Sequence, residues 1–198
     1  MFDVSALLFD LDGTLVDTRA VNYAAYAQAL AEVGVRIDEA AFNRLADGLN
    51  WRRFLPQILG EASAKAPAVA ARKAEVYKHL VDQARPNPQL IALARAAQGH
   101  LPIAVVTTAS AANARAVLVG HGLAGLFDLV VSGDDVARHK PDPEAYALAA
   151  ARLGVAPDRC LAFEDSDAGE ASATAAGMAV IRVSPWTTMI ADRIDQES

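Results

Sequence analysis

Two carboxylates near the start of the chain, Asp10 and Asp12, stand two residues apart. They follow an almost uninterrupted apolar run, residues 4–9, which predicts a buried strand of a parallel sheet. Like charges this close repel, and burying either one is costly unless it is paired or bound to a metal. Gly13 permits a sharp turn directly after the strand. A divalent cation bound by both carboxylates would offset their repulsion and the cost of burying them. The plainer interpretation is that the two acids stand where an ordinary strand passes into a loop.

Further groups of the same kind follow other apolar runs. Thr107 and Thr108 follow residues 103–106, Lys140 stands in the loop after residues 127–131, and Glu164 and Asp165 follow residues 160–163. Threonine could instead cap a helix, and a single lysine is commonly solvated surface. Taken together, the four acids suit Mg²⁺, while a hydroxyl and a lysine complement phosphoryl oxygens. This combination predicts phosphoryl transfer through an aspartyl-phosphate intermediate.

The elements that must position these residues are short strands alternating with helices. We expect strands at residues 4–9, 103–106, 127–131, 160–163 and 179–183, and helices near residues 88–98, 111–121, 143–153 and 167–176. This rhythm predicts an α/β fold, a Rossmann-like parallel sheet with helices on both faces. Ligands of such sheets bind beyond the carboxyl ends of the strands, where the candidate residues would meet.

Residues 17–85 differ from the rest, because they carry helical periodicity and no strand pattern. About four helices are expected there. The first ends at Gly34, the second starts after Asp38 and ends near Gly48, the third covers residues 51–58 and ends at Gly60, and the fourth covers residues 64–83. We therefore expect a catalytic core of residues 1–16 and 86–198, with residues 17–85 inserted as an all-helical cap.

Composition narrows the possible functions. The 198 residues are 53% apolar and 21% charged, which is typical of a globular protein. A net charge of −6 without a basic run argues against nucleic acid as a partner. The single cysteine, Cys160, excludes an internal disulfide and is expected to be a buried structural thiol. With no apolar stretch of ~18 residues and no basic leader, we expect a cytoplasmic protein that neither spans nor binds a membrane.

The motifs resemble those of the haloacid dehalogenase superfamily of hydrolases. Asp10 and Asp12 stand in the first motif, Thr107 is the second, Lys140 the third, and Glu164 with Asp165 the fourth. All four occur in order through the whole core. Residues 139–146, 163–169 and 175–178 are similar to the subgroup that contains β-phosphoglucomutase and small sugar-phosphate phosphatases, and residues 17–85 resemble its helical cap. The Trp51-Arg52 pair resembles the cap of bacterial fructose-1-phosphate phosphatases.

The resemblance implies a role for each motif residue. Asp10 would attack phosphorus, and Asp12 would act as acid and then as base. Mg²⁺ would be held by Asp10, the Asp12 carbonyl and Asp165, with Glu164 bound directly or through water. Lys140 would offset the charge between Asp10 and the phosphoryl group, with Thr107 and Thr108 beside it. Arg52 is the candidate contact from the cap to a small phosphorylated metabolite, and we expect a monomer or weak homodimer.

Two alternatives stay open. A phosphosugar mutase shares this core, but where β-phosphoglucomutase carries a histidine in the linker to the cap, this chain has Asn22, preceded by Arg19-Ala20. These departures favour hydrolysis. A non-catalytic module that only binds a phosphate ligand is the second alternative, and the complete motif set argues against it. A dehalogenase that displaces chloride needs no acid two residues after its nucleophile, so the presence of Asp12 favours phosphate chemistry.

Overall fold

The computed structural model describes residues 3–46 and 49–184. In this part of the chain the core is a five-stranded sheet with the order β5-β4-β1-β6-β7, in which all neighbouring strands are parallel. The strands are β1 (Ala6–Phe9), β4 (Ile103–Val106), β5 (Leu129–Val131), β6 (Cys160–Glu164) and β7 (Ala179–Arg182). The expected parallel α/β fold is therefore confirmed, with β1 in the centre of the sheet.

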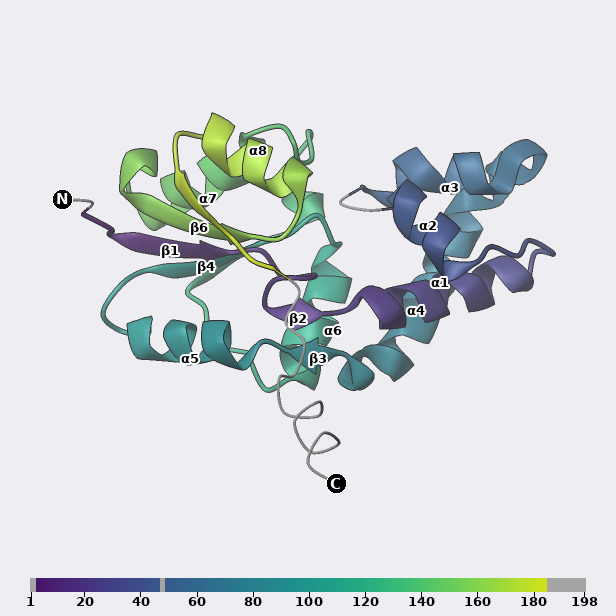
Figure 1. Ribbon diagram of the computed structural model, residues 1–198, viewed down its shortest axis with the longest axis horizontal. Helices are drawn as coiled ribbons and strands as arrows, with labels where there is room; N and C mark the ends of the chain where they lie inside the picture. Colours follow the sequence, from purple (N-terminus) through teal and green to yellow (C-terminus); the bar gives the residue numbers. More distant parts are fainter. Residues whose placement is uncertain (1–2, 47–48, 185–198) are drawn as a thin grey trace, which may run out of the picture.

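Helices cover both faces of this sheet (Figure 1). Side chains of β1 alternate between the two faces, as the two-residue period of a strand requires. Leu7 and Phe9 pack with α5 (Pro88–Ala97) and α6 (Ala111–Gly120). Ala6 and Leu8 pack on the other side with α7 (Glu144–Leu153) and α8 (Asp167–Ala175). Because β1 is buried on both faces, its end is held rigidly between two layers of helices.

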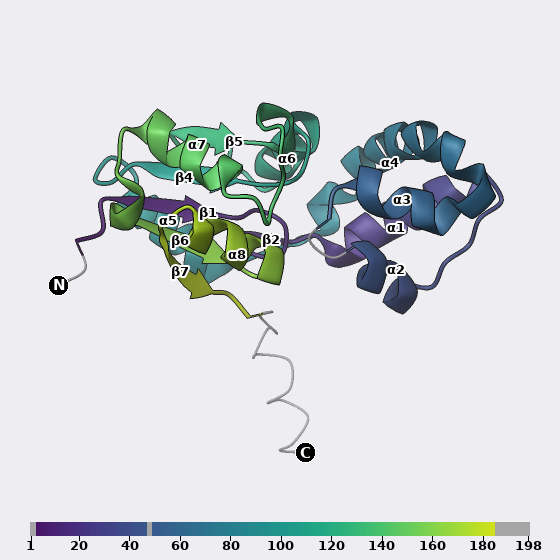
Figure 2. The same ribbon diagram turned by 90° about the horizontal axis from the view of Figure 1, so that it is seen from above.

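The helices of the inserted segment lie at one end of the molecule, beyond the sheet (Figures 1 and 2). They are α1 (Arg19–Ala31), α2 (Glu39–Ala46), α3 (Trp51–Leu59), the 3-10 turn η1 (Gly60–Lys65), α4 (Ala66–Leu80) and the 3-10 turn η2 (Val81–Gln83). A separate apolar cluster holds them together. At its centre Tyr26, Phe42 and Phe54 contact one another with ring centroids 5.2 to 5.7 Å apart.

A two-stranded antiparallel ribbon joins this helical unit to the core, and the sequence analysis did not predict it. The strands β2 (Val16–Asp17) and β3 (Arg85–Pro86) pair residue for residue. Each strand has only two residues, which is too short for a periodic pattern. The Asp17 carboxylate lies 2.9 Å from the Arg19 Nε and 3.8 Å from the Arg85 guanidinium. Both chain crossings between core and helices are thus tied together at one place.

Several element ends differ from the expectation. The run at residues 127–131 forms a strand only from Leu129, because the Asp128 carboxylate accepts the N–H of Ile103 at 2.8 Å. The expected helix at residues 64–83 is divided into η1, α4 and η2. Asp38 does accept the N–H of Ala41 at 2.8 Å at the start of α2. The expected end of α2 near Gly48 lies outside the described residues.

Two further expectations concern single features. Cys160 is buried and its thiol is free, as predicted. Among the helices of residues 3–46 and 49–184, none has the length and apolarity required to cross a membrane.

Candidate active site

Three neighbouring strands bring chemically active side chains to one edge of the sheet. Asp10 follows β1, Thr107 follows β4, and Glu164 ends β6. The N–H of Asp10 donates to the Phe163 carbonyl at 3.0 Å, and the N–H of Thr107 donates to the Val131 carbonyl at 2.9 Å. The backbone of both residues therefore continues the sheet, and their side chains start from fixed positions.

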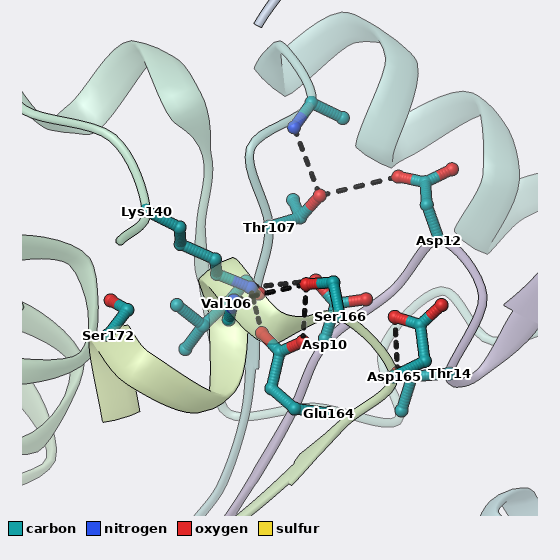
Figure 3. A network of polar contacts seen from close by, with 12 residues as sticks. Asp10, Asp12, Thr14, Val106, Thr107, Lys140, Glu164, Asp165, Ser166 and Ser172 are labelled. Atoms are coloured by element: carbon teal, nitrogen blue, oxygen red, sulfur yellow. Dashed lines mark hydrogen bonds and ion pairs between the residues drawn. The ribbon is translucent and has the colours of Figure 1, made fainter. Parts of the chain in front are cut away.

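Lys140 reaches this edge from the loop before α7 (Figure 3). Its Nζ donates to Asp10 Oδ1 at 2.7 Å, to the Val106 carbonyl at 2.9 Å and to Glu164 Oε1 at 2.5 Å. An ammonium group has three protons, so each finds an acceptor here. Lys140 is only 4% exposed, so its interpretation as solvated surface is wrong.

The loop that carries Lys140 is anchored at Asp142, two residues after the lysine. The Ser172 hydroxyl of α8 donates to the Asp142 carbonyl at 2.6 Å, and the Asp142 carboxylate accepts the N–H of Glu144 at 3.0 Å. The helix begins one residue later than expected, at Glu144, with Pro143 as its N-cap residue. Asp142 contacts the first helical N–H through a short turn, and the loop is held next to the sheet edge.

The charges around Lys140 do not balance. Burial works against the charged ammonium, but the carboxylates of Asp10 and Glu164 outweigh it, so the pKa of Lys140 lies well above its usual value. Burial also raises the pKa of Asp10 well above its usual value; Glu164 and Asp165 add to this shift, and Lys140 opposes it. Lys140 pairs with two carboxylates, and Asp165 adds a third negative charge beside Asp10, so a further positive charge would complete the site.

The carboxylates of Asp10, Glu164 and Asp165 fit such a cation. Each offers one oxygen, and these oxygens lie within 4.8 Å of one another. A set of carboxylate oxygens at this spacing suits a hard divalent ion such as Mg²⁺. Thr14 contacts this group from the side, with its hydroxyl 3.4 Å from Asp165 Oδ1. The residues present therefore agree with the expected metal site.

Asp12 points away from Lys140, toward Thr107 (Figure 3). Its Oδ1 accepts the Thr18 hydroxyl at 2.6 Å, and its Oδ2 lies 3.4 Å from the Thr107 hydroxyl. Gly13 forms the turn that follows Asp12 and leads toward the helical unit. Its φ is +94°, a backbone conformation that favours glycine. A methyl group at Gly13 would overlap the Asp165 carboxylate. The two acids of the first motif consequently have different surroundings and different neighbours.

The threonines after β4 lie at the start of α6 without capping it. The N-cap residue is Ser110, so the alternative interpretation of Thr107 as a helix cap is wrong. The N–H of Ala111, the first residue of the helix, is taken by the Asp134 carboxylate at 2.9 Å. Thr107 keeps its hydroxyl next to Asp12, and Thr108 lines the cleft beside it.

A cavity of about 750 Å³ opens between this edge of the sheet and the helical unit. Asp10, Asp12, Lys140 and Asp165 line it from the core, while Asn22 and Arg52 are among the residues that line it from the helices. The Arg52 guanidinium lies 4.6 Å from the centre of the Trp51 ring, and the residue is exposed. The helical unit thus faces the sheet edge that carries Asp10 and Lys140, and Arg52 lines the same cavity as these motif residues.

Lys73 also lines this cavity and is not among the residues predicted from the sequence. It is only 6% exposed and lies with its Nζ 4.0 Å from the centre of the Tyr77 ring and 5.0 Å from that of Tyr26. Burial lowers the pKa of Lys73 to about 8, although Asp12 opposes the shift. A signal was present in the sequence, because Lys73 stands four residues from Val69 and from Tyr77 on the apolar face of α4.

The chain matches the model of a known protein family over the residues that carry all four motifs. The model described as "haloacid dehalogenase-like hydrolase" matches residues 4–177. The chain belongs to this family. The predicted resemblance is thereby confirmed, and the chain is an enzyme of the hydrolase class.

Relatives place this haloacid dehalogenase-like hydrolase in the expected subgroup. Fructose-1-phosphate phosphatase YqaB of Escherichia coli is 37% identical over 90% of this chain and 96% of its own length. The solved structure of CbbY from Rhodobacter sphaeroides, in complex with phosphate, has a TM-score of 0.84 at 30% identity, covering 93% of this chain and 87% of that one. β-Phosphoglucomutase from Clostridium difficile has a TM-score of 0.81 at 27% identity, covering 91% and 85%.

Three other residues near the site make contacts that their sequence positions did not predict. Thr18 precedes α1 and is bound to Asp12, while Ser166 precedes α8 and lies 3.3 Å from Glu164 Oε2. Tyr146, on α7, donates its hydroxyl to Glu164 Oε1 at 2.7 Å. Their partners are distant in the sequence or set by the turn geometry, so spacing alone could not identify them.

Proposed function

We propose that this chain is a Mg²⁺-dependent phosphatase that hydrolyses a small phosphate monoester, in particular a sugar phosphate, through a phosphorylated Asp10. The observation that carries the proposal is the different placement of two carboxylates at one cavity. Asp10 lies 2.7 Å from the Lys140 ammonium, whereas Asp12 is held 2.6 Å from the Thr18 hydroxyl. The names of the phosphatase relatives support the same reaction class.

Each residue has a role in this reaction. An oxygen of Asp10 attacks phosphorus and forms the aspartyl phosphate, while Asp12 donates a proton to the leaving oxygen. Asp12 then takes a proton from the water that hydrolyses the intermediate. Lys140 offsets negative charge between Asp10 and the phosphoryl group. Thr107 and Thr108 complement phosphoryl oxygens at the side of the cavity.

Mg²⁺ would be held by Asp10, the carbonyl of Asp12 and Asp165, with Glu164 bound directly or through water. When bound, the ion supplies positive charge beside the phosphoryl oxygens. The helical unit, residues 17–85 in the proposed division of the chain, would exclude water and select the leaving group. Arg52 and Lys73 are among the cations that it contributes to the cavity, together with Arg19 and Arg44.

The decisive experiment is a screen of phosphorylated metabolites with the wild type and with Asp10→Asn. We expect Mg²⁺-dependent release of phosphate from p-nitrophenyl phosphate and from sugar phosphates, and none from Asp10→Asn. Asp158→Asn is the matched control, because Asp158 lies exposed in a 3-10 turn before β6. Activity that survives Asp10→Asn, or that persists in EDTA, would contradict the mechanism.

The mutase is the second candidate, because β-phosphoglucomutase is among the relatives. Asn22 lines the cavity at the position where the resemblance places a histidine in the mutases. Incubation with β-glucose 1-phosphate separates the two functions, since a mutase forms glucose 6-phosphate before free phosphate appears. A binding module would bind phosphate esters without turnover.

The remaining expectations stay predictions from the sequence. These are a monomer or weak homodimer, a cytoplasmic location, and a small phosphorylated metabolite rather than nucleic acid or a membrane as the partner.

A further inference from the structure

Tyr146 contacts Glu164 and Lys140, the two charged residues next to the proposed nucleophile Asp10. It lies fully buried on α7, its hydroxyl donates to Glu164 Oε1 at 2.7 Å, and the centre of its ring lies 5.0 Å from Lys140 Nζ. Burial raises the pKa of Tyr146 well above its usual value, and so the hydroxyl is a neutral donor. A buried tyrosine hydroxyl needs a partner, and here that partner is a carboxylate of the fourth motif.

Glu164 is fixed from several sides. Its Oε1 accepts both Lys140 Nζ, at 2.5 Å, and the Tyr146 hydroxyl, while its Oε2 accepts the Ser166 hydroxyl at 3.3 Å. The first turn of α8 closes the remaining side, since a methyl group at Gly169 would overlap the carboxylate. Of these three donors Lys140 is charged, and the Ser166 hydroxyl makes a longer contact. The Tyr146 hydroxyl is therefore the neutral donor with the shorter hydrogen bond. It holds Oε1 in place without removing the negative charge that Lys140 needs.

The position of Lys140 depends on that carboxylate. Lys140 stands on a loop, and its ammonium lies between Asp10 Oδ1 and Glu164 Oε1. Tyr146 stands on a helix, which holds a side chain more precisely than a loop does. If Glu164 rotated, the ammonium would follow it and leave Asp10. The tyrosine therefore acts on Asp10 through two intervening side chains.

We propose that Tyr146 is a positioning residue: its hydroxyl fixes Glu164 so that Lys140 remains on Asp10. The proposal rests on the proposed phosphatase function. Tyr146 does not line the cavity, and a change at its hydroxyl alters how Asp10 is held without altering the groups that meet the substrate. The competing interpretation is a core tyrosine whose hydroxyl is merely satisfied, which would affect folding stability alone.

Tyr146→Phe removes the hydroxyl and keeps the ring, so it separates the two interpretations. The matched control is Tyr23→Phe, which removes a hydroxyl bound to the Ile37 carbonyl at 3.2 Å, away from the cavity. kcat and KM for p-nitrophenyl phosphate and fructose 1-phosphate are measured at saturating Mg²⁺, with thermal unfolding of each variant. We expect kcat of Tyr146→Phe to fall on the order of tenfold with KM changed less than about twofold. Tyr23→Phe should keep the kcat of the wild type.

A double-mutant cycle with Glu164→Gln tests the route. If the hydroxyl acts through Glu164, Tyr146→Phe should lower kcat no further in the Glu164→Gln background. A kcat of Tyr146→Phe within about twofold of the wild type, or losses that multiply in the double variant, would overturn the proposal. Absence of turnover by the wild type would refute the proposed function instead. The crystal structure of Tyr146→Phe then decides this inference: a Lys140 ammonium displaced from Asp10 Oδ1 supports it, and one that stays within hydrogen-bond distance of Asp10 overturns it.

Discussion

The Thr18 hydroxyl donates to Asp12 Oδ1 at 2.6 Å, so the residue before the first inserted helix also orients the proposed acid and base. Thr18 is the N-cap residue of α1, yet its side chain makes no capping hydrogen bond. The hydroxyl is buried and is directed to the carboxylate instead. The junction between core and helices is therefore part of the proposed catalytic site.

Replacing Thr18 with valine tests this relationship, because valine has nearly the same shape and no hydroxyl. We expect kcat to fall on the order of tenfold, since Asp12 would lose the group that aims it. Thr18→Ser is the control, because it keeps the hydroxyl and should retain most of the activity. Steady-state kinetics of both variants provide the measurement. Equal activity of the valine and serine variants would show that the hydrogen bond is dispensable.

Gly169→Ala tests the close approach of α8 to Glu164. Alanine favours a helix over glycine by up to about 1 kcal/mol, but overpacking a buried site costs about 1–3 kcal/mol. We expect a net loss of stability in denaturant unfolding, together with reduced kcat. Gly120→Ala in α6 is the control, because the added methyl would meet only Val81, at 3.4 Å. That variant should be as stable as the wild type or slightly more stable.

Lys73 should make substrate binding sensitive to pH. Its pKa is lowered to about 8, so its ammonium is charged at neutral pH and loses its proton as the pH rises through 8. We expect KM for a sugar phosphate to rise over that range, because the attraction for an anionic ligand is lost. Lys73→Arg stays charged, since an arginine pKa lies above about 12. Its KM should lack this rise, and an identical profile for both proteins would exclude Lys73 as the cause.

Asp165→Asn should weaken the binding of Mg²⁺ to the enzyme in a measurable way. The substitution removes one carboxylate from the proposed Mg²⁺ site, so the half-activating Mg²⁺ concentration should rise at least about tenfold. Calorimetric titration with Mg²⁺ checks binding directly. Asp167→Asn is a control two residues away, because its side chain is exposed and pairs with Arg182 at 3.0 Å. Unchanged Mg²⁺ binding by the Asp165 variant would remove this residue from the metal site.

The sequence predicted the core and the meeting of the motif residues for a physical reason. Apolar runs such as residues 103–106 and 160–163 mark buried strands, and parallel strands must end at the same edge. Asp10, Thr107 and Glu164 end or follow such runs, so their proximity follows from topology alone. Lys140 could be placed because it stands before a helix in a loop stiffened by proline.

The remaining contacts depend on orientation, which periodicity does not carry. Tyr146 reads as an ordinary apolar position of α7, and its hydroxyl meets Glu164 only because α7 lies across that end of β6. Thr18 reads as a helix cap, the commoner use of threonine before a helix. The spacing of Lys73 places it on the apolar face of α4, but that this position lines the cavity is decided by how α4 packs on α1.

Because Val16 pairs with Pro86, the chain enters and leaves the inserted helices at neighbouring positions. A segment whose two ends are adjacent can be transplanted with little change to the chain that receives it. Exchanging residues 19–84 for the corresponding helices of a phosphatase relative would replace Arg52 and Lys73 together while leaving Asp10, Thr18 and Lys140 in place. The ribbon therefore separates the proposed catalytic core from the helices that are proposed to select the substrate, so that one part can be exchanged while the other is kept.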